Sequence, residues 1–284
     1  MKFSNEEQAE ILIHALPYIQ KYYGKIIVVK YGGNAMTNET LKDSVMQDVV
    51  LLSLSGMKVV LVHGGGPEIN AAFTAYGKET IKVDGLRFTD KEGASIVQQI
   101  LAGKVNKDLV KLLGNRGGKA IGLSGMDGNM IECKFKNFDK YGYVGDVVNV
   151  NPEVIYTALD HGYIPVISTV GVDKEGNSFN INADTAAAYI AGALKAEAFI
   201  NMTDIKGLLR DKNDDSTLIT EINVSELKSL EKQGIIDGGM IPKVECCVQA
   251  IRLGVSKVFI IDGRVPHSIL IEVLTDEGIG TMFK

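Results

Sequence analysis

Short runs of apolar, largely β-branched residues alternate along the chain with longer segments whose apolar residues recur at helical spacing. Continuous apolar runs of this length are typical of buried parallel strands. We expect such strands at residues 26–29, 58–62, 119–124, 163–168, 196–201, 257–261 and 280–283. We expect helices between them, at residues 40–55, 90–112, 152–160, 186–194, 225–233 and 266–274. This alternation predicts an α/β fold with a mostly parallel sheet and helices on both faces.

Two segments depart from this alternation. Residues 5–23 form an additional amphipathic helix before the first strand, which Pro17 should kink or split. The helix either lies over the core or forms an arm for a second subunit. Residues 129–150 consist of short alternating pieces separated by glycines, a pattern typical of hairpins. We expect these hairpins to form a flap over one edge of a binding site.

Composition narrows the class of protein. The chain has 284 residues, of which 45% are hydrophobic and 23% charged, with a formal net charge of −5 and no basic run. These values are ordinary for a globular protein and argue against a nucleic-acid partner. We recognise neither a signal peptide nor an apolar run long enough to span a membrane. The three cysteines have neither metal-site spacing nor an even number, so we expect structural thiols and a cytoplasmic location.

Two strand ends carry the candidate chemistry. Lys30 stands where the first strand leaves the core and is followed by Gly32 and Gly33. The second strand runs into the glycines 64–66 and then Pro67, which suits the first turn of a helix. Exposed backbone amides, a helix N-terminus and a cation together favour an anionic ligand. A solvated lysine and two tight turns are the simpler alternative, although three consecutive glycines cost more conformational entropy than a turn requires.

Charged residues farther along the chain fit the same anionic ligand. Arg87 would grip a carboxylate through its planar fork if it points into the glycine-lined cleft. Asp184 opens a small-residue helix, where the helix dipole alone explains a carboxylate, but this explanation leaves Asn180 without a role. Lys243 follows Pro242 at the start of another helix, where a cation is disfavoured by a few tenths to about 1 kcal/mol. A bound anion would remove that conflict.

This inventory suits phosphoryl transfer, which depends mainly on positioning and charge neutralisation. The sequence lacks the P-loop, the dinucleotide-binding fingerprint, the protein-kinase motifs and the nucleophile elbow. His63 ends a strand and is predicted to be a packed residue rather than a base. A carboxylate acceptor is already ionised near neutral pH and needs no general base. Two lysines, glycine amides and Mg²⁺ carried by the nucleotide would overcome the repulsion between the anions.

Five motifs, taken in order, resemble those of the amino-acid kinase family. They are Lys30-x-Gly-Gly, His63-Gly-Gly-Gly-Pro67, Gly85-Leu-Arg87, Asn180-x-Asn-Ala-Asp184 and Gly238-Gly-Met-Ile-Pro-Lys243. Within the family they are most similar to the enzymes that phosphorylate N-acetyl-L-glutamate on its γ-carboxylate. The resemblance implies a three-layer αβα sandwich with an N-terminal oligomerisation helix at residues 1–25, an N-acetylglutamate-binding lobe at 26–180 and an ATP-binding lobe at 181–284.

The resemblance also implies roles for individual residues. Lys30 and Lys243 would stabilise the transferring phosphoryl group, and Asp184 would hold both lysines. N-acetylglutamate would be bound by Gly65, Gly66, Arg87 and Asn180. ATP would be bound by Gly32, Gly33, Asp204, Ile205, Lys206, Gly207, Leu208, Leu209, Ile235, Ile236 and Asp237. Mg²⁺ would arrive with the nucleotide and have no direct protein ligand.

The N-terminal helix is similar to that of the arginine-inhibited members, which join dimers into hexamers through it. An inhibitory arginine would then bind at Tyr18, His267, Glu272 and Gly278, where the Glu272 carboxylate suits a guanidinium. The alternatives are a kinase for another small acid, such as glutamate, aspartate or carbamate, or a non-catalytic amino-acid sensor. Gly85-Leu-Arg87 and the N-terminal helix favour N-acetylglutamate as the substrate over another small acid. Lys30, Asp184 and Lys243 argue against the second, because a sensor needs no charge aimed at a γ-phosphate.

Overall fold

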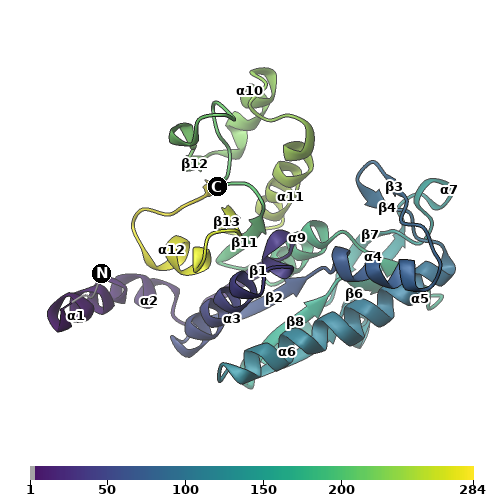
Figure 1. The fold of residues 1–284 in the computed structure, drawn as a ribbon, viewed down its shortest axis with the longest axis horizontal. Coiled ribbons are helices and arrows are strands. Elements are labelled where there is room, and N and C mark those ends of the chain that lie inside the picture. The colour runs from purple at the N-terminus through teal and green to yellow at the C-terminus, as the bar shows by residue number, and fades with distance from the viewer. Residues whose placement is uncertain (1–3) are drawn as a thin grey trace.

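The computed structural model describes residues 4–284, with the backbone alone for Asn34. An eight-stranded sheet in the order β12-β14-β13-β11-β1-β2-β8-β5 runs through the molecule (Figure 1). The strands are β1 (Ile26–Tyr31), β2 (Lys58–His63), β5 (Ala120–Ser124), β8 (Ile164–Ser168), β11 (Ala198–Thr203), β12 (Glu221–Ile222), β13 (Lys257–Asp262) and β14 (Thr281–Phe283). Neighbours are parallel except for β13 and β14. The predicted α/β fold is confirmed. The one strand of this sheet that was not predicted is β12, which has two residues and is too short to give an apolar run.

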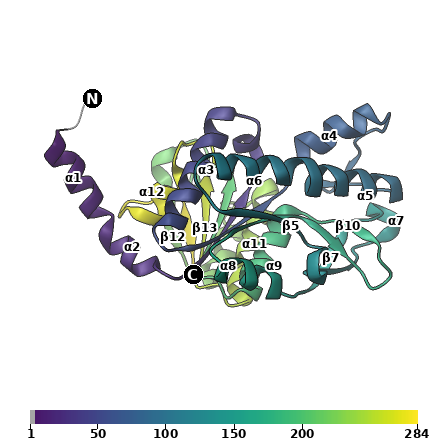
Figure 2. The same ribbon diagram turned by 90° about the horizontal axis from the view of Figure 1, so that it is seen from below.

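Helices cover both faces of this sheet (Figure 2). One face packs against α3 (Glu39–Leu54), α6 (Asn106–Asn115) and α12 (Ser268–Leu274), and the other against α8 (Glu153–Asp160), α9 (Ala183–Ala193), α10 (Leu227–Lys232) and α11 (Ile241–Arg252). Alternation along β1 sends Val29 and Tyr31 towards α3, and Val28 towards α9. Lys30 therefore leaves the sheet on the α9 side. The buried alanines of α9 let this helix approach β1 closely.

One sheet contains strands from both predicted lobes, since β1 pairs with β2 on one side and with β11 on the other. The boundary at residues 180 and 181 falls between β10 (Ser178–Asn180) and α9. The division into lobes stays a prediction. Residues 1–3 of the predicted oligomerisation segment lie outside the described residues.

The N-terminal segment forms two helices, α1 (Asn5–His14) and α2 (Leu16–Tyr22), which extend away from the sheet (Figures 1 and 2). Ser4 caps α1 in a capping box with Glu7, and Pro17 lies in the first turn of α2. The predicted helix and its break are confirmed. No residue of α1 is buried, and Leu12 is 73% exposed, so α1 does not lie over the core.

The segment predicted to form a flap, residues 129–150, contributes two strands to a four-stranded sheet in the order β10-β9-β6-β7, whose other two strands lie outside the predicted range. We call this sheet the flap. Its strands β6 (Ile131–Phe135) and β7 (Gly145–Val150) are antiparallel and flank the short helix α7 (Phe138–Tyr141), while β9 (Val170–Val172) leads to β10. Edge-to-face contacts among Phe135, Phe138, Tyr143 and Phe179 stiffen it. A separate hairpin, β3 (Lys82–Val83) and β4 (Leu86–Arg87), lies beside it (Figure 1).

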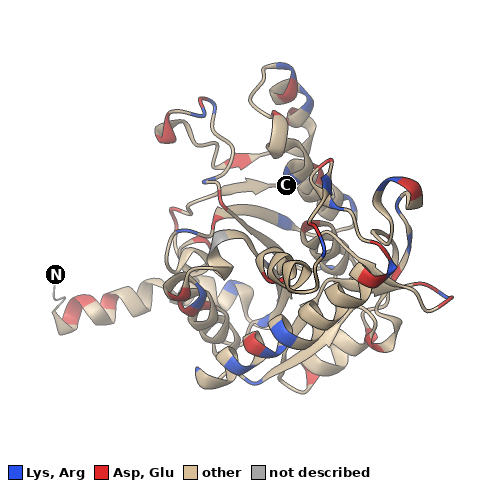
Figure 3. Ribbon diagram, turned by 45° about the vertical axis from the view of Figure 1, so that its right-hand side comes forward, with Lys and Arg blue, Asp and Glu red and all other residues tan. Residues whose placement is uncertain are grey.

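The remaining helices include α4 (Gly66–Ala75) and α5 (Lys91–Gln98). A π-helical segment, Gln99–Val105, joins α5 to α6, so residues 91–115 form one long helix with an inserted residue. Short 3₁₀ helices occur at Gly33–Met36, Asp127–Asn129, Asp215–Thr217, Val224–Glu226 and Gly238–Met240. Acidic and basic residues are mixed along the described elements (Figure 3). Among residues 4–284, every helix is too short or too polar to cross a lipid bilayer.

Candidate active site

Lys30 and Asp184 form a buried ion pair beneath the N-terminus of α9. Lys30 is 7% exposed, and its Nζ lies 2.8 Å from Asp184 Oδ1. The same Nζ donates a hydrogen bond to the carbonyl oxygen of Met202, at 3.2 Å on the neighbouring strand. The ion pair and the hydrogen bond together fix the position of the ammonium group.

Asp184 is positioned by its helix, paired with Lys30 and influenced by the charge of Lys243. Asn182 caps α9 by accepting a hydrogen bond from the Thr185 amide at 3.1 Å, which places Asp184 in the first turn. Burial alone would raise the pKa of Asp184, but the ammonium groups of Lys30 and Lys243 outweigh burial and hold the pKa below its ordinary value. The structure therefore shows the predicted contact of Asp184 with Lys30, while Lys243 acts on the carboxylate only through its charge, and the role of Asp184 in holding both lysines stays a prediction.

Lys243 lies in the first turn of α11, immediately after Pro242. With Asp184 and Cys246 it lines a cavity of about 540 Å³ between α9, α11 and the flap. Burial raises the pKa of Cys246 to about 12, so this thiol stays protonated and is no nucleophile at neutral pH. Structural roles remain our interpretation of all three cysteines, which are free.

A second, smaller cavity of about 200 Å³ adjoins the first and shares three of its lining residues, Leu86, Val144 and Asn182. The structure brings all four predicted substrate ligands to its wall: Gly65, Gly66, Arg87 and Asn180. Gly66 opens α4, so the helix N-terminus faces the cavity together with the glycine loop.

Arg87 is only 8% exposed and is fixed by four contacts, one of which is a hydrogen bond that it donates to Asn70 Oδ1 at 2.5 Å. It donates to the Gly66 carbonyl at 3.2 Å and to Thr80 Oγ1 at 3.0 Å, and it lies over the Phe73 ring at 5.2 Å. Asn180 donates to Thr89 Oγ1 at 3.2 Å. Such contacts orient both side chains before any ligand arrives, which lowers the entropic cost of binding.

The predicted phosphate-binding glycines lie beside the lysine and an aspartate. A Cβ on Gly32 would lie 3.0 Å from Lys30 Nζ, and a Cβ on Gly33 would lie 2.6 Å from Asp204 Oδ1. Gly33 also has a φ of +67°, which favours glycine. The glycine pair therefore leaves room for the ammonium and for the carboxylate.

The other predicted nucleotide-binding residues occupy varied surroundings. The side chains of Leu208 and Ile236 are buried in the core, so a ligand could reach only their backbone groups. Ile205 and Ile235 pack partly against the same cluster. Lys206 pairs with Asp215, and Gly207 lies so close to Thr281 that a Cβ would clash. Leu209 forms an isolated bridge with Leu218, and Asp237 precedes the 3₁₀ helix Gly238–Met240.

The predicted arginine-binding residues are brought together only in part. Tyr18, Glu272 and Gly278 line one cavity of about 340 Å³ between α2 and the C-terminal elements. The Glu272 carboxylate there accepts hydrogen bonds from the amides of Ile279 and Gly280, at 2.9 and 3.1 Å. His267 is not among the lining residues of this cavity, and its Nδ1 instead pairs with Asp48 of α3 at 2.6 Å. His267 immediately precedes α12, and its place in the sequence gave no sign of the pairing with Asp48.

Several cavity residues were not predicted. Leu101 of the π-helical segment lies against the loop, since a Cβ on Gly65 would be 2.7 Å from its Cδ2. Val144 of the flap and Lys82 of β3 also line the smaller cavity. Helical periodicity could have suggested that Leu101 is a core residue. It could not have shown that Leu101 faces the cavity, because the residue inserted in the π-helical segment leaves no signal in the local sequence.

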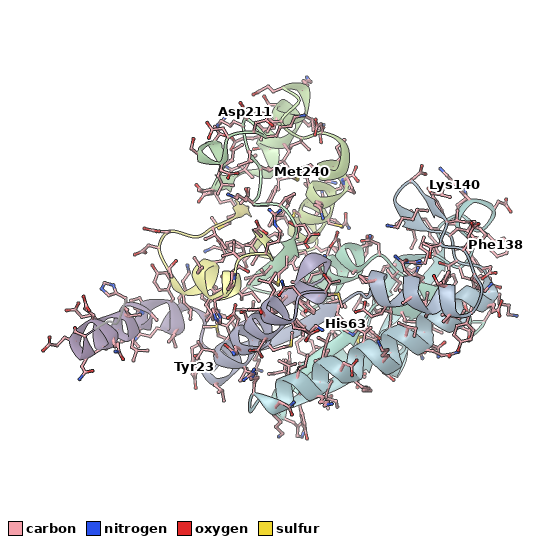
Figure 4. The ribbon with its side chains drawn as sticks, viewed as in Figure 1. Tyr23, His63, Phe138, Lys140, Asp211 and Met240 are labelled. Atoms are coloured by element: carbon pink, nitrogen blue, oxygen red, sulfur yellow. The ribbon has the colours of Figure 1, made fainter. Side chains whose placement is uncertain are left out.

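His63 is a packed residue, as predicted. It lies in the interior of the molecule (Figure 4), where Asn106 Nδ2 is 3.1 Å from its Nε2 and the Gly64 carbonyl is 2.8 Å from its Nδ1. Burial lowers the pKa of His63 to about 4, which keeps the ring neutral. The ring supports the start of the glycine loop.

A magnesium ion at this site would meet single carboxylates. Among residues 4–284, no three carboxylate, histidine or cysteine groups gather as a metal cage. Mg²⁺ is commonly held by substrate phosphates, waters and one or two carboxylates. Asp184 is already paired with Lys30, whereas Asp204 lies against the glycine pair predicted to bind phosphates.

Comparison with known proteins agrees with this geometry. Residues 25–262 match the model of the amino acid kinase family. The chain is 57% identical to acetylglutamate kinase of Brachyspira hyodysenteriae, covering 99% of this chain and 98% of that protein. It is 53% identical to acetylglutamate kinase of Clostridioides difficile, with the same coverage of 99% and 98%. N-acetylglutamate synthase from Neisseria gonorrhoeae, solved with coenzyme A and N-acetyl-glutamate, is similar with a TM-score of 0.83 and 26% identity. The match covers 97% of this chain and 63% of that synthase.

Proposed function

The chain belongs to the amino acid kinase family and resembles proteins named acetylglutamate kinase, so we propose that it phosphorylates N-acetyl-L-glutamate and acts in arginine biosynthesis. The γ-carboxylate would accept the γ-phosphoryl group of ATP, giving N-acetyl-L-glutamyl 5-phosphate and ADP. The observation that carries this proposal is the pairing of Asp184 with Lys30, with Lys243 close enough to influence its pKa, next to the cavity lined by Arg87.

The reaction needs two anions to meet. A γ-carboxylate oxygen attacks the terminal phosphorus in line, and the bond from phosphorus to the bridging oxygen breaks as ADP leaves. Lys30 and Lys243 would stabilise the charge on the transferring group, and Asp184 would keep both ammonium groups oriented. Mg²⁺ carried by the nucleotide would neutralise part of the phosphate charge when bound.

The smaller cavity supports a substrate with two carboxylates. The Gly65 and Gly66 amides at the start of α4 suit the reacting carboxylate, and Arg87 suits the other. Asn180 offers an amide to the acetamido group. We propose Gly32, Gly33, Asp204 and the segments 205–209 and 235–237 for ATP, which divides the chain into lobes at 26–180 and 181–284. The free cysteines suit a cytoplasmic enzyme.

A hydroxamate assay tests this function. Acyl phosphates react with hydroxylamine, so ATP-dependent hydroxamate should form from N-acetylglutamate and much less from glutamate or aspartate, which lack the acetyl group. Higher turnover with glutamate or aspartate would replace this proposal with a different amino-acid kinase. Absence of hydroxamate from all three acids, in a protein that still binds arginine, would favour the sensor.

We also propose feedback inhibition by arginine and a hexamer built from dimers through residues 1–25. The exposed apolar residues Ile11, Leu12 and Ile13 of α1 support a partner surface, and the cavity beside Tyr18 and Glu272 supports a cationic ligand. Deleting residues 1–23 should yield dimers with weakened arginine inhibition, measured by light scattering and by the same assay. An unchanged hexamer would contradict the role of the helix.

A further inference from the structure

Lys82 is a cation in the smaller cavity to which the proposed function gives no role. It belongs to β3 and lines this cavity together with Arg87 and the glycines 64–66. Among residues 4–284, no carboxylate pairs with its ammonium group. The charge of Lys82 is therefore available to an anionic ligand in the cavity.

The hairpin of β3 and β4 places Lys82 directly beside Arg87. The two residues are opposite each other in the antiparallel pairing. The Phe88 amide donates to the Ile81 carbonyl at 2.9 Å, so the next pair, Lys82 and Arg87, is a non-hydrogen-bonded pair. Side chains of such a pair share one face of the hairpin and approach each other most closely, and like charges in this arrangement repel. An anion bound between the two cations would remove this repulsion.

The tip of the hairpin is fastened to α7, beside which it lies (Figure 1). Asp84, in the turn, accepts a hydrogen bond from the Tyr141 hydroxyl at 2.7 Å and pairs with Lys140 at 2.5 Å. A two-stranded hairpin is at best marginally stable alone, so these contacts help to hold β3 and Lys82 at the cavity. They also pair the Asp84 carboxylate with Lys140 rather than with Lys82.

Arg87 by itself offers a carboxylate an incomplete set of donors. Its two Nη atoms already donate to Thr80 Oγ1, to the Gly66 carbonyl and to Asn70 Oδ1. A free guanidinium would present two parallel donors to a carboxylate, and these contacts occupy part of that set. A second cation on the same face of the hairpin would supply the missing attraction.

We propose that Lys82 and Arg87 together bind the carboxylate of N-acetylglutamate that does not react, which makes Lys82 a determinant of substrate affinity. This inference rests on the proposed function and adds a residue to its substrate site. The reacting carboxylate meets the amides of Gly65 and Gly66, and the other carboxylate extends towards the hairpin. Lys82 therefore holds the substrate without acting on the transferring phosphoryl group.

Steady-state kinetics of Lys82→Met tests the inference, because methionine keeps an unbranched apolar side chain and removes the charge. The KM for N-acetylglutamate should rise about five- to tenfold, an effect between those of exposed and of desolvated ion pairs. The kcat and the KM for ATP should stay unchanged, because an interaction with the non-reacting end is the same in the ground state and in the transition state. Lys82→Arg keeps the charge and should restore most of the affinity.

Lys134→Met is the matched control, since Lys134 is an exposed lysine on β6 of the flap. Its KM values should equal those of the unmodified protein. Added sodium chloride gives a second readout, because salt screens charge–charge attraction. The KM for N-acetylglutamate should increase with salt less steeply in Lys82→Met than in Lys134→Met.

The inference is overturned if Lys82→Met has the same KM for N-acetylglutamate as Lys134→Met, or if Lys82→Arg is as impaired as Lys82→Met. A fall in kcat without a rise in KM would also overturn it, because Lys82 would then act on the phosphoryl group. Absence of turnover of N-acetylglutamate by the unmodified protein would instead refute the proposed function, so the two failures are distinguishable.

Discussion

Replacing Asp184 with asparagine tests whether this carboxylate holds Lys30 and Lys243, the two lysines that we propose to be catalytic. The substitution keeps the shape of the side chain and its place in the first turn of α9, but it leaves the Lys30 ammonium without its anion. The two side chains are 9% and 18% exposed, so water screens the lost attraction only weakly. Removing one partner of a buried ion pair costs about 3 to 5 kcal/mol. We therefore expect the free energy of unfolding to fall by about 3 kcal/mol at pH 7.

The chain supplies a matched control in Lys58 and Asp160. Their ion pair has nearly the same length, 2.9 Å, but the side chains are 40% and 62% exposed. Exposed pairs contribute at most about 1 kcal/mol, so Asp160→Asn should change stability little. Urea denaturation of both variants, followed by circular dichroism, measures the two costs side by side.

The pH dependence gives this comparison a second readout. The folded-state pKa of Asp184 is held below its ordinary value, so its stabilising contribution is present at neutral pH and is lost as pH falls through the folded pKa. The loss of unfolding free energy caused by Asp184→Asn should accordingly become smaller at acid pH. Turnover should fall by about 10²-fold because the lysines lose their orientation. A cost no larger than that of Asp160→Asn, with near-normal turnover, would refute this reasoning.

Three further predictions concern His63, Asn201 and Gly33, which lie on or directly after the strands that carry the site. Burial lowers the pKa of His63 from 6.5 to about 4, so the unfolded chain takes up the proton first; at 1.36 kcal/mol per pKa unit this costs about 3 kcal/mol between pH 7 and 4. In denaturant titrations, the unfolding free energy of His63→Asn should lack this part of the pH dependence. If the unfolding free energy of the variant and of the unmodified protein fell equally between pH 7 and 4, this prediction would be wrong. Asn201 is fully buried, and neither side-chain polar atom has a partner among the described residues, so Asn201→Leu should raise the unfolding free energy by about 1 to 3 kcal/mol. A lower melting temperature would mean that the amide is satisfied in solution. Gly33→Ala should lower stability by about 1 to 3 kcal/mol and weaken nucleotide binding, since it introduces strain at a positive φ and pushes Asp204 aside; unchanged calorimetric affinity would contradict the role of this turn.

Local patterns predicted seven of the eight strands of the main sheet and most helices, and they marked two strand ends as candidates for anion binding. An apolar run followed by Lys30 and two glycines is a local signal, and so are the three glycines after His63. The resemblance supplied the pairing of Lys30 with Asp184, because those residues are far apart in the chain and only the packing of α9 on β1 brings them together.

Other features depend on long-range packing and left no local signal. The π-helical segment directs Leu101 towards Gly65, although periodicity predicted only a continuous helix. Asp48 of α3 captures His267 because α12 packs on α3, which no pattern near His267 indicates. β14 runs antiparallel to β13 because the chain reverses its direction after α12. The apolar pattern of β14 could not predict this, because it would be the same for a parallel strand.

The central claim is that Lys30 and Lys243, from distant parts of the chain, act on the same phosphoryl group. Single-turnover measurements on Lys30→Ala, Lys243→Ala and the double variant test it most directly, with circular dichroism as the check on folding. Each single substitution should lower the rate of phosphoryl transfer by about 10²-fold or more, and the double variant should lose less than the product of the two, because both lysines serve one transition state. Near-normal rates in either folded single variant would contradict the account.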